Sequence, residues 1–120
     1  MGNRVFGCDI CQEVCPWNGE KQSARWPAPE PAYAPRGGLE GPHLVQWTER
    51  LLSMSGKEYL RTFAGSPLAR PRRQGMLRNL CVALGNRLAG QDPPDPTAVA
   101  ALVRALDDRH PLVRQHAAWA

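Results

Sequence analysis

The sequence contains no long apolar run. No stretch of its 120 residues approaches the roughly 18 consecutive apolar residues that a membrane span requires. The opening residues, Met1-Gly2-Asn3-Arg4, do not resemble the start of a signal peptide. The sequence therefore predicts a cytoplasmic protein with no membrane partner. In that compartment, closely spaced cysteines more often bind metal or serve redox chemistry than form disulfides.

Lysine is scarce, and acidic residues are missing from one part of the chain. The sequence has two lysines against thirteen arginines, and residues 60–90 contain no Asp or Glu. Six arginines fall in this segment: Arg61, Arg70, Arg72, Arg73, Arg78 and Arg87. Outside it the two signs nearly balance, so the segment accounts for the net charge of +4. Such a field attracts phosphates or an acidic surface, although a solvated arginine-rich face is an equally open interpretation.

Residues 19–42 lack the pattern of either a helix or a central strand. Five prolines lie between Pro27 and Pro42, and proline removes an amide donor and fixes φ. This segment is predicted to be an extended connector lying on a surface, with Trp26 and Tyr33 as anchors.

From residue 43 onward, apolar residues recur at helical spacing. The first predicted helix, His43–Met54, places Leu44, Trp47, Leu51 and Leu52 on one face. Ser55 and Glu58 match a capping box for the next helix, whose predicted buried residues are Tyr59, Leu60 and Phe63.

Proline marks the starts of further predicted helices. Ser66-Pro67 is one such signal, and Pro71 precedes a helix from Arg72 to about Leu88 with a stripe of Met76, Leu77, Leu80, Cys81, Leu84 and Leu88. Asp95-Pro96 opens a helix whose predicted apolar face is Val99, Leu102, Val103 and Leu106. After a turn at 107–111, a last helix runs from Leu112 to Ala120.

A weak internal repeat links two of these helices. LRNLCVALG (77–85) aligns with VRQHAAWA (113–120) at an offset of 36 residues, which matches Arg78 with Arg114 and Cys81 with Ala117. Small residues at the second pair allow two helices to approach closely. This pattern is typical of an α-solenoid of HEAT type. Because such repeats bury their faces on neighbours, we expect the solenoid to continue past residue 120.

Three cysteines near the beginning of the chain follow the spacing C-x2-C-x3-C-P: Cys8, Cys11 and Cys15, with Pro16 after the last. Thiolates at such spacing bind zinc or iron–sulfur clusters. A zinc knuckle requires a second C-x2-C pair or histidines, and the histidines here are distant. The spacing instead matches the last three cysteines of the ferredoxin run C-x2-C-x2-C-x3-C-P, in which the cysteine before proline binds the other cluster.

This pattern predicts that Cys8 and Cys11 ligate one [4Fe–4S] cluster and that Cys15 ligates a second. Two clusters need eight thiolates, and this segment supplies three. The fourth cysteine, Cys81, lies on an apolar helical stripe and is predicted to be a core residue. We therefore expect five ligands to lie outside these 120 residues.

Two segments resemble one enzyme family. NRVFGCDICQEVCPWN (3–18) is similar to the second iron–sulfur motif of epoxyqueuosine reductases, and FAGSPLARPRRQGMLRNLCVALGN (63–86) resembles the start of their C-terminal HEAT-like domain. HPLVRQHAAWA (110–120) resembles the following repeat.

The resemblance implies a mainly α fold that is truncated at both ends. Residues 1–18 would be the C-terminal part of a two-cluster, ferredoxin-like domain, 19–42 a proline-rich connector and 43–120 an incomplete α-solenoid of HEAT-like repeats. It further implies a monomeric oxidoreductase that converts epoxyqueuosine to queuosine in the anticodon region of tRNA, the last step of queuosine biosynthesis. The cofactors would be two [4Fe–4S] clusters and cobalamin, reduced by an external electron donor. The cobalamin domain and its general acid would lie outside this segment, which alone would be inactive.

The resemblance also implies a role for the arginine-rich segment in tRNA binding. The residues that would contact tRNA phosphates are Arg70, Arg72, Arg73 and Arg78. For Arg78 an alternative is a structural ion pair between repeats with Asp107 or Asp108. Two other functions stay open: a free-standing α-solenoid binding module with a zinc knuckle, and a fragment similar to the reductive dehalogenases. A HEAT-like tail argues against the latter.

Overall fold

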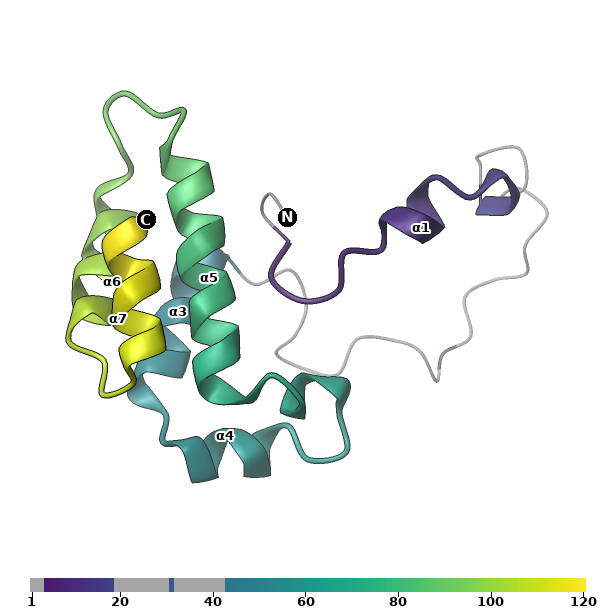
Figure 1. Ribbon diagram of the computed structural model, residues 1–120, viewed down its shortest axis with the longest axis horizontal. Helices are drawn as coiled ribbons and strands as arrows, with labels where there is room; N and C mark the ends of the chain where they lie inside the picture. Colours follow the sequence, from purple (N-terminus) through teal and green to yellow (C-terminus); the bar gives the residue numbers. More distant parts are fainter. Residues whose placement is uncertain (1–3, 19–30, 32–42) are drawn as a thin grey trace. The chain divides into compact units, whose positions relative to one another are not determined.

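The computed structural model describes residues 4–18, 31 and 43–120, and these residues form helices and turns without strands (Figure 1). The predicted mainly helical fold is confirmed to that extent. The chain divides into two units, one made of Met1–Phe6 with His43–Ala120 and the other of Gly7–Pro42. The predicted connector and its anchors Trp26 and Tyr33 lie outside the described residues, Pro31 excepted. The predicted domain boundaries stay predictions.

The larger unit is an assembly of helices around α5. Its elements are α3 (Leu44–Ser53), α4 (Gly56–Thr62), the 3-10 turn η3 (Pro67–Ala69), α5 (Arg72–Leu88), α6 (Pro96–Leu106) and α7 (Pro111–Trp119). Within this unit α5 packs most extensively against α7 and next against α3, while α6 packs against α7 and α3 (Figure 1). In the part of the chain that the structure describes, no helix combines the length and apolar character of a membrane span.

Local capping chemistry sets the starts of these helices where the sequence predicts them. The Ser55 hydroxyl accepts a hydrogen bond from the Glu58 amide at 3.1 Å, and the Glu58 carboxylate accepts one from the Ser55 amide at 3.3 Å. The predicted capping box of α4 is therefore confirmed. Asp95 caps α6 in a similar way, because its carboxylate accepts from the Thr97 amide at 2.9 Å.

The core of the larger unit follows the predicted stripes in three helices and departs from them in α6. The fully buried side chains of large volume include Leu51, Tyr59, Leu77, Leu80 and Leu84. Leu60, which was predicted to be buried, is 47% exposed.

In α6 the predicted face is wrong except for one residue. Leu102 is buried, but Val99, Val103 and Leu106 are exposed. The buried face consists instead of Ala98, Ala101 and Ala105 together with Leu102. The buried face of α6 thus consists mainly of small side chains, and α6 packs against α7, α3 and α5.

The pairing of α5 with α7 is close. Cys81 and Ala117, which are matched in the sequence repeat, are both buried. At Gly85 an added Cβ would lie 2.8 Å from the Cβ of Ala120 and 2.9 Å from its Cα. The close approach is observed at Gly85 and Ala120, whereas for Cys81 and Ala117 the structure shows burial.

Candidate functional site

The cysteine segment, residues 7–18 of the smaller unit, is a tight loop followed by two short helical turns. Gly7 and Asp9 have left-handed backbones, with φ of 68° and 47°. Glycine adopts this conformation freely and aspartate adopts it more readily than most residues. Asp9 is the N-cap of α1 (Ile10–Glu13), and its carbonyl accepts hydrogen bonds from the amides of Gln12 and Glu13, both at 2.9 Å. Cys8 therefore sits between two left-handed residues, and Cys11 lies on the turn that follows.

The second turn, η1 (Pro16–Asn18), follows Cys15 directly. The Asn18 side chain donates to the Gln12 carbonyl at 3.0 Å, and the Asn18 amide donates to the Cys15 carbonyl at 2.9 Å. These two bonds fix the path of the chain on both sides of Cys15.

The thiols of this segment are accessible. Cys8 and Cys11 are exposed and Cys15 is half-buried, and all are free thiols. Among residues 4–18, 31 and 43–120, no three His, Cys, Asp or Glu side chains converge in a way that would hold one metal ion. The predicted division does not require such a group, because it assigns two thiolates to one cluster and one to another. The ligand assignment stays a prediction.

Cys81 has a different environment. It is fully buried on α5, and burial raises the pKa of its thiol to about 11, with a further contribution from the negative charge of Asp108. Its apolar, fully buried position on α5 is that of a small core residue. The prediction that Cys81 is a core residue is confirmed.

The predicted tRNA-binding arginines fall into three environments. Arg70 and Arg72 are exposed, Arg78 is half-buried and Arg73 is buried. Arg72 is the first residue of α5 and has a left-handed φ of 56°.

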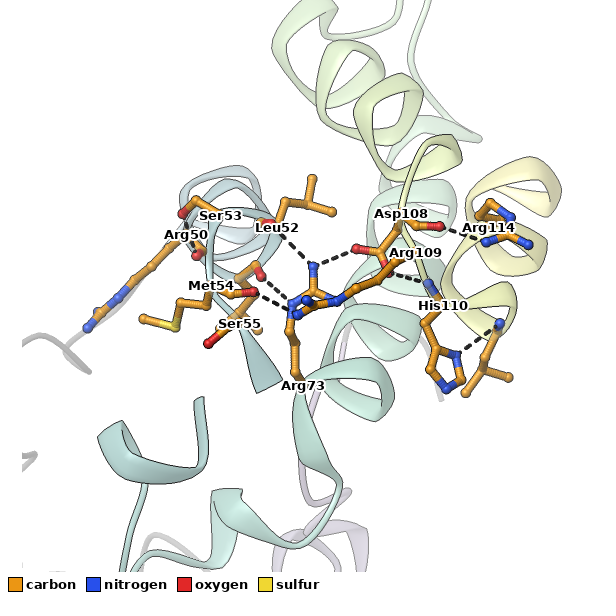
Figure 2. A network of polar contacts seen from close by, with 12 residues as sticks. Arg50, Leu52, Ser53, Met54, Ser55, Arg73, Asp108, Arg109, His110 and Arg114 are labelled. Atoms are coloured by element: carbon orange, nitrogen blue, oxygen red, sulfur yellow. Dashed lines mark hydrogen bonds and ion pairs between the residues drawn. The ribbon is translucent and has the colours of Figure 1, made fainter. Parts of the chain in front are cut away.

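Arg73 is fully occupied by contacts inside the helical unit (Figure 2). Its guanidinium donates to the Leu51 carbonyl at 2.9 Å and to the Leu52 carbonyl at 3.2 Å. It also pairs with Asp108, with N–O distances of 3.2 and 2.5 Å. The side chains of Arg73 and Asp108 are 4% and 3% exposed. We therefore remove Arg73 from the predicted tRNA contacts, because none of its charge faces a solvent-borne phosphate.

The carboxylate of Asp108 remains ionised in this setting. Burial by itself would raise the pKa, but the hydrogen bonds from Arg73 and the His110 amide, with the positive charges of Arg73 and Arg109, lower it below the ordinary 3.8. Asp108 thereby joins the turn between α6 and α7 to α5, while Arg73 joins both to the last turn of α3. We call this set of contacts the Arg73–Asp108 knot.

The ion pair considered for Arg78, with Asp107 or Asp108, does not form among the described residues, and Asp108 pairs with Arg73 instead. Arg78 donates to the side-chain oxygen of Asn79 at 3.0 and 2.8 Å, and Asn79 donates to the Val5 carbonyl at 2.7 Å. Five residues correspond to a rotation of about 140° around a helix. Arg78 therefore faces a different side of α5 from Arg73, whose guanidinium pairs with the Asp108 carboxylate. The repeat partner of Arg78, Arg114, donates to the Asp108 backbone carbonyl at 2.8 Å.

Two cations that sequence reasoning missed lie close to this knot. Lys57 and Arg109 line a surface hollow together with Arg72. Both lie outside the acid-free segment 60–90, and their convergence depends on the fold. In the sequence, the one feature that could have drawn attention to Arg109 is its position within the predicted turn at 107–111.

Several curated proteins are similar in sequence to this chain over its whole length. The whole chain is 42% identical to an epoxyqueuosine reductase of Alicycliphilus denitrificans, 40% identical to that of Pseudomonas aeruginosa and 38% identical to that of Escherichia coli K12. The chain is related over its full length to epoxyqueuosine reductases. The resemblance seen in the sequence is thereby confirmed.

The alignment spans a minor part of these epoxyqueuosine reductases. It covers 100% of this chain but 32%, 30% and 28% of the three relatives, in the same order. No family model matches the sequence, and no solved structure matches the fold.

Proposed function

We propose that this chain is a segment of an epoxyqueuosine reductase, an oxidoreductase that converts epoxyqueuosine to queuosine in tRNA. The observation that carries this proposal is the similarity of all 120 residues to relatives of that name at 35–42% identity. The cysteine segment and the arginine-rich helix both lie within the aligned length, which favours one enzyme over two unrelated modules.

In this proposal the cysteine segment holds parts of two [4Fe–4S] clusters. Cys8 and Cys11, both exposed on a tight loop, would ligate one cluster, and Cys15, on the far side of α1, would ligate the other. The donor set fits, since free thiols at this spacing suit iron–sulfur chemistry. When bound, such clusters transfer single electrons. The chain itself contributes the rigid turn fixed by Asp9 and Asn18, which sets the direction in which each thiol projects. Cobalamin would bind outside this segment.

The helical unit would position tRNA. The α6–α7 pair, its tight turn and the repeat-related burial of Cys81 and Ala117 support a HEAT-like arrangement. Arg70 and Arg72 are exposed beside η3 and at the start of α5, where phosphates would meet no neighbouring acid from residues 60–90. Arg78 contributes less, because its guanidinium is held by Asn79.

Metal analysis tests the cluster assignment. The natural polypeptide that carries this segment, produced without oxygen, should contain about eight irons per chain. Cys8→Ala and Cys15→Ala should each lose iron but leave different residual EPR spectra, because they damage different clusters. Cys81→Ala, the same substitution at a buried thiol, is the control and should retain all the iron. Identical spectra for the first two variants would contradict the division of ligands, and zinc without iron would favour a zinc-knuckle binding module instead.

Binding and turnover test the tRNA assignment. The wild-type protein should bind tRNA with an affinity that falls steeply with salt. Arg70→Ala should reduce the salt dependence, whereas Arg87→Ala, which removes the same charge near the other end of α5, should leave it unchanged. Failure of the natural polypeptide that carries this segment to convert epoxyqueuosine in tRNA under reducing conditions would refute the proposed reaction.

A further inference from the structure

A surface hollow of about 490 Å³ lies where the start of α4, the start of α5 and the α6–α7 turn come together. Three separate parts of the sequence contribute to it. Its lining consists of Ser55, Gly56, Lys57, Leu60, Arg72, Arg73, Gln74 and Arg109. Four of these side chains are cationic, and none is a carboxylate.

The lining of the hollow carries an excess of positive charge. Arg73 is neutralised by Asp108, but Lys57, Arg72 and Arg109 form no ion pair with any described residue. Arg109 donates to the Met54 carbonyl at 3.4 Å, which is an uncharged acceptor. Glu58, next to Lys57, accepts a hydrogen bond from the Ser55 amide in the capping box and is not among the lining residues. Three cationic groups therefore line one hollow without a counter-charge in its wall.

A neighbouring hollow shows that this composition is not a general property of the surface. That hollow, of about 370 Å³, shares Ser55, Arg73 and Arg109 with the first, but Asp107 and Asp108 also line it. Its remaining cation, Arg104, forms an ion pair with Glu49. Charges of both signs meet there, whereas one sign alone lines the larger hollow.

The fold holds the three cations on fixed supports. The capping box fixes the backbone before Lys57, and Arg72 precedes the buried Arg73 directly. Arg109 follows Asp108, which is bound to Arg73. The Arg73–Asp108 knot thus places Arg72 and Arg109 one residue from each end of a buried ion pair. The backbone at each cation is therefore fixed before a charged group binds, and the ordering cost is limited to the three exposed side chains.

We propose that this hollow binds a phosphate group. Guanidinium groups match phosphate oxygens with paired hydrogen bonds, and an ammonium group adds a further charge. The side-chain amide of Gln74 and the hydroxyl hydrogen of Ser55 add neutral donors. A tetrahedral anion accepts from several directions at once, which suits donors that come from three elements. The phosphate would be a backbone phosphate of tRNA, an assignment that rests on the proposed function, or a free phosphate.

The first arm of the test uses inorganic phosphate and the full 120-residue chain. Phosphate added at constant ionic strength should shift the side-chain NMR signals of Arg72 and Arg109, and chloride should not. The variant Arg72→Ala/Arg109→Ala should lose the saturable phosphate response. The matched control, Arg50→Ala/Arg87→Ala, removes two exposed arginines outside the hollow and should retain it. Circular dichroism of both variants checks that each is folded.

The second arm measures tRNA binding as a function of salt for the same proteins. A tRNA phosphate in the hollow predicts that the slope of log K against log salt falls by about 0.7–0.9 per lost contact in the Arg72→Ala/Arg109→Ala variant, and not in the control. An unchanged slope with intact phosphate binding identifies a free phosphate as the occupant.

Absence of any phosphate-specific shift at Arg72 and Arg109, or equal loss in the control variant, would overturn the proposal. A wild-type protein that binds no tRNA would refute the proposed function alone, since the phosphate titration does not depend on it.

Discussion

The Arg73–Asp108 knot offers a quantitative test of what holds the helical unit together. Asp108→Asn keeps the size of the side chain and one acceptor oxygen but removes the negative charge that faces the Arg73 guanidinium. Removing one partner of a buried ion pair costs about 3–5 kcal/mol. The knot also lines a surface hollow, so water reaches one side of it and a loss of about 3 kcal/mol is expected.

Arg73→Met should cost at least as much. Methionine preserves most of the apolar stem but removes four hydrogen bonds, including those to the Leu51 and Leu52 carbonyls. The Leu51 carbonyl also accepts from the Met54 amide at 3.3 Å and so keeps a partner, whereas the Leu52 carbonyl loses its bond from Arg73. A buried polar group left unsatisfied costs about 1–3 kcal/mol. Since a unit of about 80 residues is stable by about 4–12 kcal/mol, each variant should lose a large share of its stability.

Urea denaturation of the full chain, followed by far-UV circular dichroism, measures these losses. The double variant Arg73→Met/Asp108→Asn should lose at least about 1 kcal/mol less than the sum of the single variants, because neither charge is then left unpaired. Arg104→Met is the control, since the Arg104–Glu49 pair is exposed, with side chains 58% and 31% accessible. It should cost less than about 1 kcal/mol. Additive losses, or an Asp108→Asn variant as stable as the control, would refute the reasoning.

Three further predictions concern pH and local hydrogen bonds. The pKa of the Asp108 carboxyl lies below 3.8 in the folded chain, so the ionised group stabilises the fold above pH 3.8 and this stabilisation is lost as the pH falls through the folded pKa. The urea midpoint should therefore fall at acidic pH in the wild type, and fall less in Asp108→Asn. Parallel pH profiles of the two proteins would contradict this prediction. Ser55→Ala should cost about 1 kcal/mol through loss of the capping box. Ser53→Ala removes only an exposed hydrogen bond to the Arg50 carbonyl at 2.8 Å and should cost less in the same assay. Tyr59 donates to the Leu68 carbonyl at 2.6 Å, so Tyr59→Phe should cost about 1 kcal/mol at neutral pH. Burial raises the pKa of Tyr59 from 10.0 to about 12; the wild type should therefore lose stability between those pH values, and an equal alkaline loss in the phenylalanine variant would count against this cause.

Helix starts could be predicted from the sequence because capping is a local interaction. Ser55 and Glu58 are three residues apart, and Asp95 lies two residues from the amide it caps. α5 begins at Arg72, directly after Pro71, and ends at Leu88, as the proline and the apolar stripe indicate.

The buried face of α6 could not be predicted in the same way. A scale of side-chain hydrophobicity ranks Val99, Val103 and Leu106 above alanine, yet Ala98, Ala101 and Ala105 face the neighbouring helices. Which face of α6 is covered depends on how α3 and α7 pack against it, and that packing is a property of the assembled unit. No pattern of residues within α6 predicts it.

Only those parts of the site that depend on residues close together in the sequence could be predicted. Spacing alone singled out Cys8, Cys11 and Cys15, and the apolar stripe identified Cys81 as a core residue. The role of Arg73 depends on a partner 35 residues away, and the charge excess in its segment gave no means to distinguish it from the exposed Arg72 beside it. Lys57 and Arg109 line the same hollow as Arg72 only because α4 and the α6–α7 turn both meet the start of α5 in the folded unit.

The span of the Arg73–Asp108 knot has a kinetic consequence. Arg73 reaches back 22 residues to Leu51 and forward 35 residues to Asp108, so the contacts close only after three helices have assembled and excluded water. Interactions that form after the transition state slow unfolding more than they speed folding. The knot should therefore lengthen the lifetime of the native unit while leaving the rate at which the chain first collapses nearly unchanged.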